Sequence, residues 1–515
     1  MQSCTSPCRR FAIGCGTGEA LRTFSQAEQF ALERTFSKAP AGLSFPGDSQ
    51  YSCGTSLNCP NWKKFFPRIG IVFDPKGDGK MTIRAAYGIF GDRNHMFYSN
   101  FMSQYAPFGG NVSQSNVDLL NPWAVYPGGN PIPALTSSNG LGHADPNGTF
   151  PSLGTYVRMP LDNYKAPYVN QWNLSIQRQV GKDWLLTMNY LGNSQIHMTT
   201  SNLLNPAVYL GQGACTLQTV NGAGQVVSTN YPTCSTTANQ QFRRILSLQN
   251  PVQGNFYSGI SYGDDGGTSS YQALYFSAQK RLSKGVSVLT NYTWSHCIGN
   301  IQDQQTSATG VAAIPGDRDR YRGNCAGIDT RHNFILNMVA TSPKFSRKSL
   351  RLVASDWQIA PILTIRSAQY FTVTSGTDRA LTTATTQTAN YAGGNTRASS
   401  SGCSPAPCVQ WANPSAFAVP PLGTYGNLGQ ANIAGPGMIQ VNLALSRTFP
   451  VWGEKRTLQV RAEAFNLPNR VNFSIPVNSL SSPNFGQVIT DISGNNGLSS
   501  QGDPRIVQLA MKLVF

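Results

Sequence analysis

The residues of this chain that could perform chemistry are its histidines, its cysteines and a few acidic groups. The five histidines are scattered, and none pairs with another at metal-ligand spacing. The chain contains no G-x-S-x-G, H-E-x-x-H, P-loop or dinucleotide-binding fingerprint. The sequence therefore predicts no catalytic, cofactor-binding or metal-binding residue, and we expect a protein that is not an enzyme. The histidines are His95, His143, His197, His296 and His332.

Three acidic stretches come closest to a cation site. The heptapeptide at 74–80 (DPKGDGK) resembles a calcium loop, but Lys76 occupies a ligand position and Ala85 stands where a bidentate Glu is needed. It is predicted to be a tight turn. The run at 263–267 (GDDGG) could bind calcium, although an acidic turn is the favoured interpretation. Three aspartates, each directly before an arginine, are predicted to be solvated loop charges: Asp317, Asp319 and Asp378.

Eight of the eleven cysteines form close sequence pairs in Gly/Ser/Asn-rich stretches, which predicts local disulfides in an oxidising compartment. A zinc site would need two Cys knuckles, and only the last pair approaches one. The odd total leaves at least one thiol unpaired. The pairs are Cys53/Cys59, Cys215/Cys234, Cys297/Cys325 and Cys403/Cys408, with Cys4, Cys8 and Cys15 left over.

The elements that must position these residues are strands, and the C-terminal stretch at 505–515 shows the pattern most clearly. One alternate set is apolar and the other is polar or small in its middle, which indicates a strand with two differently solvated faces. A soluble antiparallel sheet gives the same alternation. Because nothing can follow to cover the edge of an apolar terminal strand, we predict the closing strand of a membrane barrel. Its expected lipid-facing set is Val507, Leu509, Met511, Leu513 and Phe515.

Ten further strands are predicted in five pairs. The connections within pairs are short, whereas those between pairs, near 88–170, 193–270, 296–332, 367–438 and 466–504, are long. Outer-membrane barrels combine short periplasmic turns with long extracellular loops. The predicted fold is therefore all-β, an antiparallel transmembrane β-barrel with Phe515 at the periplasmic end. The pairs are 68–73 with 81–87, 172–180 with 184–192, 271–281 with 286–295, 333–340 with 357–366, and 439–449 with 457–465.

Eleven strands is an odd number, whereas bacterial single-chain barrels have even numbers. The stretch at 487–491 is a candidate twelfth strand, and strands missing before the first pair are the other explanation. The first 20 residues lack the apolar core of a signal peptide, so we expect a truncated or misassigned start. Residues 1–66 are predicted to be an irregular N-terminal segment, and residues 67–515 to form the barrel portion.

Composition agrees with this class. Charged residues make up only 12% of the chain, against about 25% in typical soluble domains. No apolar run reaches the roughly 18 residues of a transmembrane helix. The formal charge of +16 is dispersed, without a nucleic-acid recognition motif. We therefore expect no nucleic-acid partner, and anionic outer-membrane lipid and lipopolysaccharide as the partners of the basic surface.

Several motifs, in their order along the chain, resemble the barrel region of TonB-dependent outer-membrane transporters of the Oar-like type. This resemblance covers roughly residues 40–515. The motifs are 66–70 (FPRIG), 74–80 (DPKGDGK), 84–88 (RAAYG), 167–178 (PYVNQWNLSIQR), 292–295 (YTWS), 329–332 (DTRH), 357–359 (WQI), 371–373 (FTV) and 458–466 (LQVRAEAFN).

The resemblance implies a barrel of about 22 strands, of which 11–12 are visible here, a plug domain inside it and a TonB box that couples transport to the proton gradient. No plug or TonB box is found before residue 66. The chain is therefore similar to the C-terminal part of a transporter that moves a bulky, unidentified ligand across the outer membrane. The TonB complex is expected as a partner only through a plug and TonB box not found in this chain.

Two other functions remain open. A plug-less structural or adhesive surface protein would bind partners through disulfide-pinned loops, and in that case Met1 would be a genuine start. A secreted β-sandwich binding module would stay soluble without detergent.

The two faces of the terminal strand give a first testable prediction. Leu509→Arg should lower the free energy of unfolding from a bilayer by about 2–4 kcal/mol if the site lies near the midplane. Gln508→Arg should be nearly neutral. Urea titrations of both variants in lipid vesicles measure the difference, and equal penalties would contradict the assignment of faces.

Overall fold

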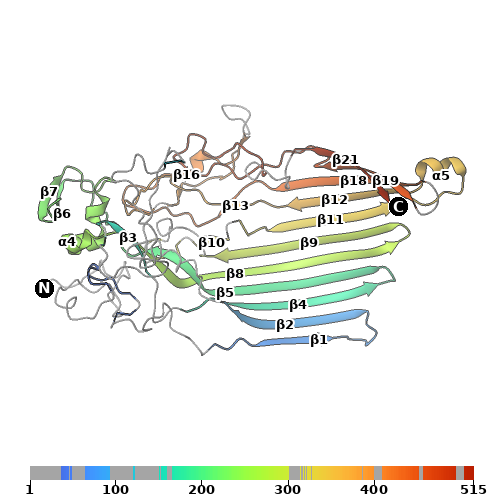
Figure 1. Ribbon diagram of the computed structural model, residues 1–515, viewed down its shortest axis with the longest axis horizontal. Helices are drawn as coiled ribbons and strands as arrows, with labels where there is room; N and C mark the ends of the chain where they lie inside the picture. Colours follow the sequence, from blue (N-terminus) through green and yellow to red (C-terminus); the bar gives the residue numbers. More distant parts are fainter. Residues whose placement is uncertain are drawn as a thin grey trace.

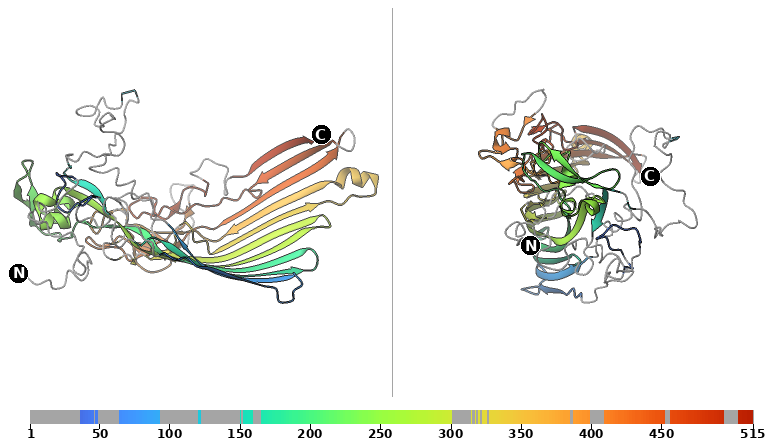
Figure 2. Two further views of the ribbon diagram at one scale, coloured as in Figure 1. Left: turned by 60° about the horizontal axis from the view of Figure 1, so that its bottom comes forward. Right: turned by 90° about the vertical axis from the view of Figure 1, so that its left-hand side faces the viewer.

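The computed structural model consists mainly of one large, curved antiparallel sheet that is followed at one end by a loop assembly (Figures 1 and 2). None of the helices in the described part of the chain is long and apolar enough to cross a bilayer. The structure describes residues 36–45, 47–48, 64–92, 120–121, 150, 152–158, 165–300, 314, 317, 319–320, 322–325, 327–384, 387–398, 409–451, 456–493 and 504–514.

Eleven strands follow one another across the sheet in sequence order, and each pairs antiparallel with the next. All eleven predicted strands are present, so the all-β antiparallel prediction is confirmed. Two short strands, β3 (Gly154–Arg158) and β10 (Gly323–Asn324), attach to the sheet beside this path. The eleven are β1 (Arg68–Phe73), β2 (Met81–Gly91), β4 (Tyr168–Val180), β5 (Trp184–Leu203), β8 (Tyr257–Ser283), β9 (Val286–Gly299), β11 (His332–Thr341), β12 (Trp357–Arg366), β18 (Met438–Pro450), β19 (Thr457–Phe465) and β21 (Ile506–Val514).

One face of the sheet is apolar across its whole width. Residues that are directly paired on neighbouring strands lie on the same face, so the register can be followed from β1 to β18. We call the set of directly paired residues that passes through Phe276 the Phe276 row. Every member of this row is apolar or aromatic. The row is Phe73, Ile83, Ile176, Met188, Phe276, Tyr292, Phe334, Ile365 and Ile439.

The described part of the predicted lipid-facing set on β21 lies on this same apolar face. Val507 pairs with Ala464 of β19, which pairs with Leu443 of β18. In the same way, Leu509 pairs with Ala462, which pairs with Leu445. Phe515 itself lies outside the described residues. The face assignment of the terminal strand therefore agrees with the register of its neighbours.

Aromatic rings border this apolar face at both ends. Trp184, Trp357 and Phe449 lie at the end with the short turns, and Trp172 and Trp294 lie toward the loop assembly. Trp172 is paired with Gly192, and a Cβ at Gly192 would overlap its indole ring. From Trp184 to Gly192 the strand rises about 26 Å at about 3.3 Å per residue. This distance matches the roughly 25 Å apolar band of outer-membrane barrels.

The short connections all lie at one end of the sheet, and β21 runs toward that end (Figure 1). They span 74–80, 181–183, 284–285, 342–356 and 451–456, and the fourth contains helix α5 (Lys348–Ala354). Val514, the last described residue, pairs with Thr457 directly after the final turn. The predicted segregation of short and long connections is confirmed.

The turn at 74–80 is organised by one carboxylate and is tight, as predicted. Asp74 accepts hydrogen bonds from the backbone N–H groups of Lys76, Gly77 and Gly79 at 3.2, 3.1 and 2.7 Å. Gly77 and Gly79 have φ of 65° and 69°, a conformation that glycine adopts without strain. The hydrogen bond from Gly79 is the largest cause that lowers the pKa of Asp74 below 3.8, and desolvation opposes it.

Because the folded turn favours the carboxylate, its contribution to stability is present above pH 3.8 and is lost as the pH falls through the lower folded-state pKa. We expect backbone amide exchange in the 74–80 turn, corrected for intrinsic rates, to accelerate below about pH 4. Asp74→Asn should remove this pH dependence. If the variant shows the same acceleration, the carboxylate is not its cause.

Two predictions about the connections are wrong. The run at 263–267 is not an acidic turn: it lies inside β8 and pairs with β5 across two register shifts. The candidate twelfth strand at 487–491 contributes only the two-residue β20 (Gln487–Val488), which pairs with β15 (Val409–Gln410) outside the large sheet. Both stretches lie beyond the aromatic borders, where the bilayer no longer imposes period-two alternation.

The long connections fold into a loop assembly with two apolar cores. One core is built from the 367–437 and 466–504 connections around Val373, Ala389 and Phe417, with three two-stranded sheets. The other joins Phe36 and Phe45 to Tyr257. The three two-stranded sheets are β13 (Tyr370–Phe371) with β17 (Ile433–Ala434), β14 (Asn390–Tyr391) with β16 (Phe417–Ala418), and β15 with β20. The loop assembly also contains a hairpin of β6 (Cys215–Val220) and β7 (Val226–Tyr231). Its short helices are η1 (Gln240–Arg243), α3 (Ile245–Gln249), α4 (Pro251–Gly254) and η2 (Pro414–Ala416).

Candidate functional site: the polar face and the loop assembly

The face opposite the apolar one is lined mainly by uncharged polar side chains. In every strand the residue next to a member of the Phe276 row points to this opposite face. Of the eight paired residues in the corresponding row, all but Ile335 are polar and none is charged. The row is Thr82, Gln177, Thr187, Ser277, Asn291, Ile335, Thr364 and Gln440.

The next row toward the loop assembly adds charge to the polar face. It runs from Val72 and Arg84 through Ser175, Asn189 and Tyr275, and by way of Thr293 and Asn333 it reaches Arg366 and Met438. The Tyr275 hydroxyl donates to Asn291 Oδ1 at 2.7 Å. The buried amide oxygens of Asn189, Asn193 and Asn333 accept no hydrogen bond from any described residue. This second row therefore keeps the polar character of the face and adds one arginine on β2 and one on β12.

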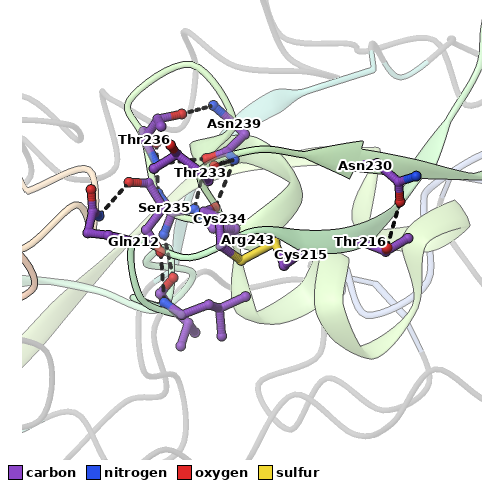
Figure 3. The surroundings of a disulfide bond; sticks show 12 residues. Gln212, Cys215, Thr216, Asn230, Thr233, Cys234, Ser235, Thr236, Asn239 and Arg243 are labelled. Atoms are coloured by element: carbon purple, nitrogen blue, oxygen red, sulfur yellow. Dashed lines mark hydrogen bonds between the residues drawn. A yellow bond between two sulfur atoms is a disulfide. The ribbon is translucent and has the colours of Figure 1, made fainter.

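The loop assembly is held together by a buried arginine beside a disulfide (Figure 3). Arg243 is fully buried, and it donates to Asn239 Oδ1 at 3.0 Å, to Thr236 O at 2.9 Å, to Leu381 O at 3.3 Å and to Val208 O. Asn239 in turn donates to Cys234 O at 2.8 Å. One guanidinium therefore connects the 204–256 and 367–437 connections.

Its neighbour Arg244 repeats this bridging. Arg244 Nη1 donates to Asn205 O at 2.6 Å and lies 3.4 Å from Thr383 Oγ1. Burial lowers the pKa of Arg244 to about 10, and burial also lowers that of Arg243, where the charge of Asp378 opposes the shift. Sequence reasoning missed both arginines, although two cations flanked by Phe242, Ile245 and Leu246 are a signal for buried charge.

Asp378 is not the solvated loop charge that was predicted. Its carboxylate accepts hydrogen bonds from Thr382 N, Thr383 N, Gln240 Nε2 and Gln387 Nε2 at 2.5 to 3.2 Å. The bond from Gln240 crosses between the two connections. Asp317 and Asp319 are exposed, although Asp319 accepts a hydrogen bond from Asn300 Nδ2 at 2.8 Å.

Two of the four predicted disulfides are present. Cys215 is bonded to Cys234 across the β6–β7 hairpin, and Cys297 is bonded to Cys325. The pairs Cys53/Cys59 and Cys403/Cys408 lie outside the described residues, as do Cys4, Cys8 and Cys15. The two bonds close loops with sequence separations of 19 and 28 residues in the loop assembly.

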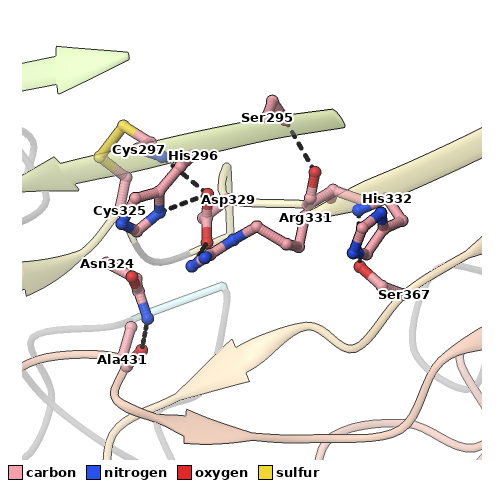
Figure 4. A network of polar contacts seen from close by, with 11 residues as sticks. Ser295, His296, Cys297, Asn324, Cys325, Asp329, Arg331, His332, Ser367 and Ala431 are labelled. Carbon is pink, nitrogen blue, oxygen red and sulfur yellow. Dashed lines mark hydrogen bonds and ion pairs between the residues drawn. A yellow bond between two sulfur atoms is a disulfide. The ribbon is translucent and has the colours of Figure 1, made fainter. Parts of the chain in front are cut away.

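The second disulfide adjoins a polar network where the sheet meets the loops (Figure 4). The buried Asp329 carboxylate accepts from Cys297 N at 2.7 Å and faces His296 Nδ1 at 3.5 Å and Arg331 Nη2 at 3.4 Å. Asn324 donates to Ala431 O at 2.8 Å. This network fixes the beginning of β11 against the end of β9.

The other two described histidines, His197 and His332, have separate polar partners. His197 approaches the backbone oxygen of Asp265 at 3.2 Å, and His332 Nδ1 lies 2.8 Å from the Tyr292 hydroxyl. His95 and His143 lie outside the described residues. Among the described residues, no cluster of three or more His, Cys, Asp or Glu side chains is placed to hold a metal ion.

Comparison with known proteins identifies the family. Residues 19–508 match the family model described as "Outer membrane beta barrel domain". No curated protein matches the chain. Solved structures with a similar fold include the outer membrane transporter YddB from Escherichia coli (TM-score 0.41, 10% identity, 86% of this chain and 40% of that chain). The ferric-catecholate import receptor Fiu from E. coli is similar with a TM-score of 0.32, 10% identity, and 87% and 34% coverage.

The siderophore receptor PirA from Acinetobacter baumannii has a TM-score of 0.34 and 10% identity, with 79% of this chain and 37% of that chain covered. These three similarities concern fold alone. The chain spans 40% or less of the length of these three proteins. The family match covers nearly the whole chain and agrees with the two-faced antiparallel sheet. The chain belongs to the outer membrane beta barrel domain family, and its place is the outer membrane of Gram-negative type.

Proposed function

We propose that this chain forms the C-terminal portion of the barrel of an Oar-like, TonB-dependent receptor. In the complete protein it would carry a bulky ligand across the outer membrane with energy from the proton gradient. The observation that carries the proposal is the polar face, whose row from Thr82 to Gln440 is uncharged and which leads to the folded loop assembly at one end of the sheet (Figure 1). A polar surface of this width could line a path for the ligand. The loop assembly could bind the ligand first.

The edges of the sheet support a larger barrel. Within the described residues β1 pairs only with β2 and β21 only with β19, and both edge strands run toward the short turns. If β1 and β21 paired directly with each other, that pairing would be parallel. Unpaired backbone groups cost several kcal/mol each in hydrocarbon, so the edges must be completed. Antiparallel closure needs an odd number of further strands, which agrees with an even total.

The test is a comparison of wild-type cells with cells that lack the gene, incubated in fractionated culture medium. Mass spectrometry then measures which solutes disappear from the medium. We expect at least one bulky solute whose depletion requires both the gene and an intact proton gradient. If no solute depends on the gene, or if depletion persists after a protonophore collapses the gradient, the transport proposal is wrong.

The two disulfides and the Arg243 bridge favour one second candidate, a surface protein that binds partners through its rigid loops. This function requires no energy. Gene-dependent attachment to other cells or to a matrix, unaffected by a protonophore but abolished by a reducing agent, would support it over transport.

A further inference from the structure

The fourth short connection, at 342–356, differs from the others because it contains helix α5, which extends beyond the rim of the sheet (Figure 1). Two side chains of the apolar face hold its last turn. Trp357 Nε1 donates to Val353 O at 2.7 Å, and the Arg447 guanidinium donates to Leu352 O. Trp357 and Arg447 are paired in register on that face, and the Arg447 guanidinium lies 5.4 Å from the Trp357 ring centroid. The end of α5 is therefore fixed at the lipid side of the rim.

The helix exposes large apolar side chains. Leu350, Leu352 and Val353 are 45%, 74% and 67% exposed, and no residue of α5 is buried. In water this exposure would be unfavourable. A short helix at a membrane surface instead places such side chains about 5–10 Å into the boundary between headgroups and acyl chains.

The same connection is strongly basic. It carries four exposed cations and a single acidic residue, Asp356. No side chain of opposite charge forms a salt bridge with any of the four cations among the described residues. Cations next to membrane-inserted apolar side chains attract anionic headgroups by about 1 kcal/mol each. The four are Lys344, Arg347, Lys348 and Arg351.

We propose that residues 344–353 form a binding surface for anionic phospholipid headgroups of the periplasmic leaflet. Leu350, Leu352 and Val353 enter the acyl region, while the four cations contact phosphate. The surface anchors the rim of the sheet in the membrane. It rests on the outer-membrane location and not on any transported ligand.

The test uses the full protein in its own outer membrane, with the photocrosslinking residue p-benzoylphenylalanine in place of Leu352. The same residue in place of Leu248, a 41% exposed leucine on α3 in the loop assembly, is the matched control. After irradiation, mass spectrometry identifies the molecule attached at each position. We expect phospholipid adducts at position 352, enriched in anionic lipids over their share of the membrane, and none at position 248.

A second set of variants tests the cations. Lys344→Gln, Arg347→Gln and Lys348→Gln together should lower the anionic-to-zwitterionic ratio of the adducts roughly tenfold or more. Lys182→Gln with Lys284→Gln, which removes two exposed cations from neighbouring turns, should leave the ratio unchanged. Adducts with a periplasmic protein, no lipid adduct, or lipid adducts without headgroup preference in the parent would each overturn the proposal.

Discussion

Phe276→Arg is expected to lower the free energy of unfolding of the membrane-embedded protein by about 2–4 kcal/mol. Phe276 lies on the apolar face. Four residues before it on β8, Gln272 is level with the border residue Trp172. Four residues after it, Lys280 is paired with the border residue Trp184. It is therefore midway between the two aromatic borders, where an arginine is most costly. The measurement is a denaturant titration of the protein in phospholipid vesicles.

Ser277→Arg is the matched control, one residue further along β8 on the opposite face. Its paired neighbours are Thr187 and Asn291, so an arginine there meets a polar, water-accessible surface. We expect a change below about 1 kcal/mol, because an arginine that stays hydrated has no desolvation cost. A larger penalty at Ser277 than at Phe276 would reverse the assignment of faces.

The second large effect concerns the loop assembly. Arg243→Met should destabilise this assembly by about 3–5 kcal/mol, because the carbonyl oxygens of Val208, Thr236 and Leu381 lose their buried donors. That loss corresponds to a roughly 10²–10⁴-fold larger population of locally opened loops. Amide exchange and protease cleavage in the 204–256 connection measure it, with the strands of the sheet as an internal reference.

Arg320→Met is the control for Arg243, because Arg320 is an exposed arginine elsewhere in the long connections. A surface substitution of this kind usually changes stability by less than about 0.5 kcal/mol. Similar exchange rates in the two variants would show that the Arg243 guanidinium does not hold the connections together.

Within the bilayer-spanning region the sequence was sufficient to predict the strands, because lipid on one face and polar surroundings on the other impose period-two alternation. On β9, for example, Val288, Tyr292 and Trp294 are predicted on one face and Asn291 and Thr293 on the other. The register of β9 confirms this assignment.

Beyond the aromatic borders that constraint ends, and there the extent of the strands and the contacts between loops were not predicted, although the two described disulfides were. The strand β8 begins at Tyr257 rather than near residue 271, because its Gly, Ser and Asp residues follow no alternation. The inter-loop contacts of Arg243 and Asp378 depend on residues 138 positions apart, and no local pattern reveals such a pairing.

Labelling of the native outer membrane by a phospholipid that carries a diazirine in its acyl chain tests the two-faced sheet most directly. After irradiation and digestion, mass spectrometry locates the labelled residues along β9 and β12. We predict labels on Val288, Tyr292, Leu363 and Ile365, and none on Asn291 or Thr364. Labels on both faces alike, or recovery of the unlabelled protein in the aqueous fraction, would contradict a transmembrane sheet with one lipid face.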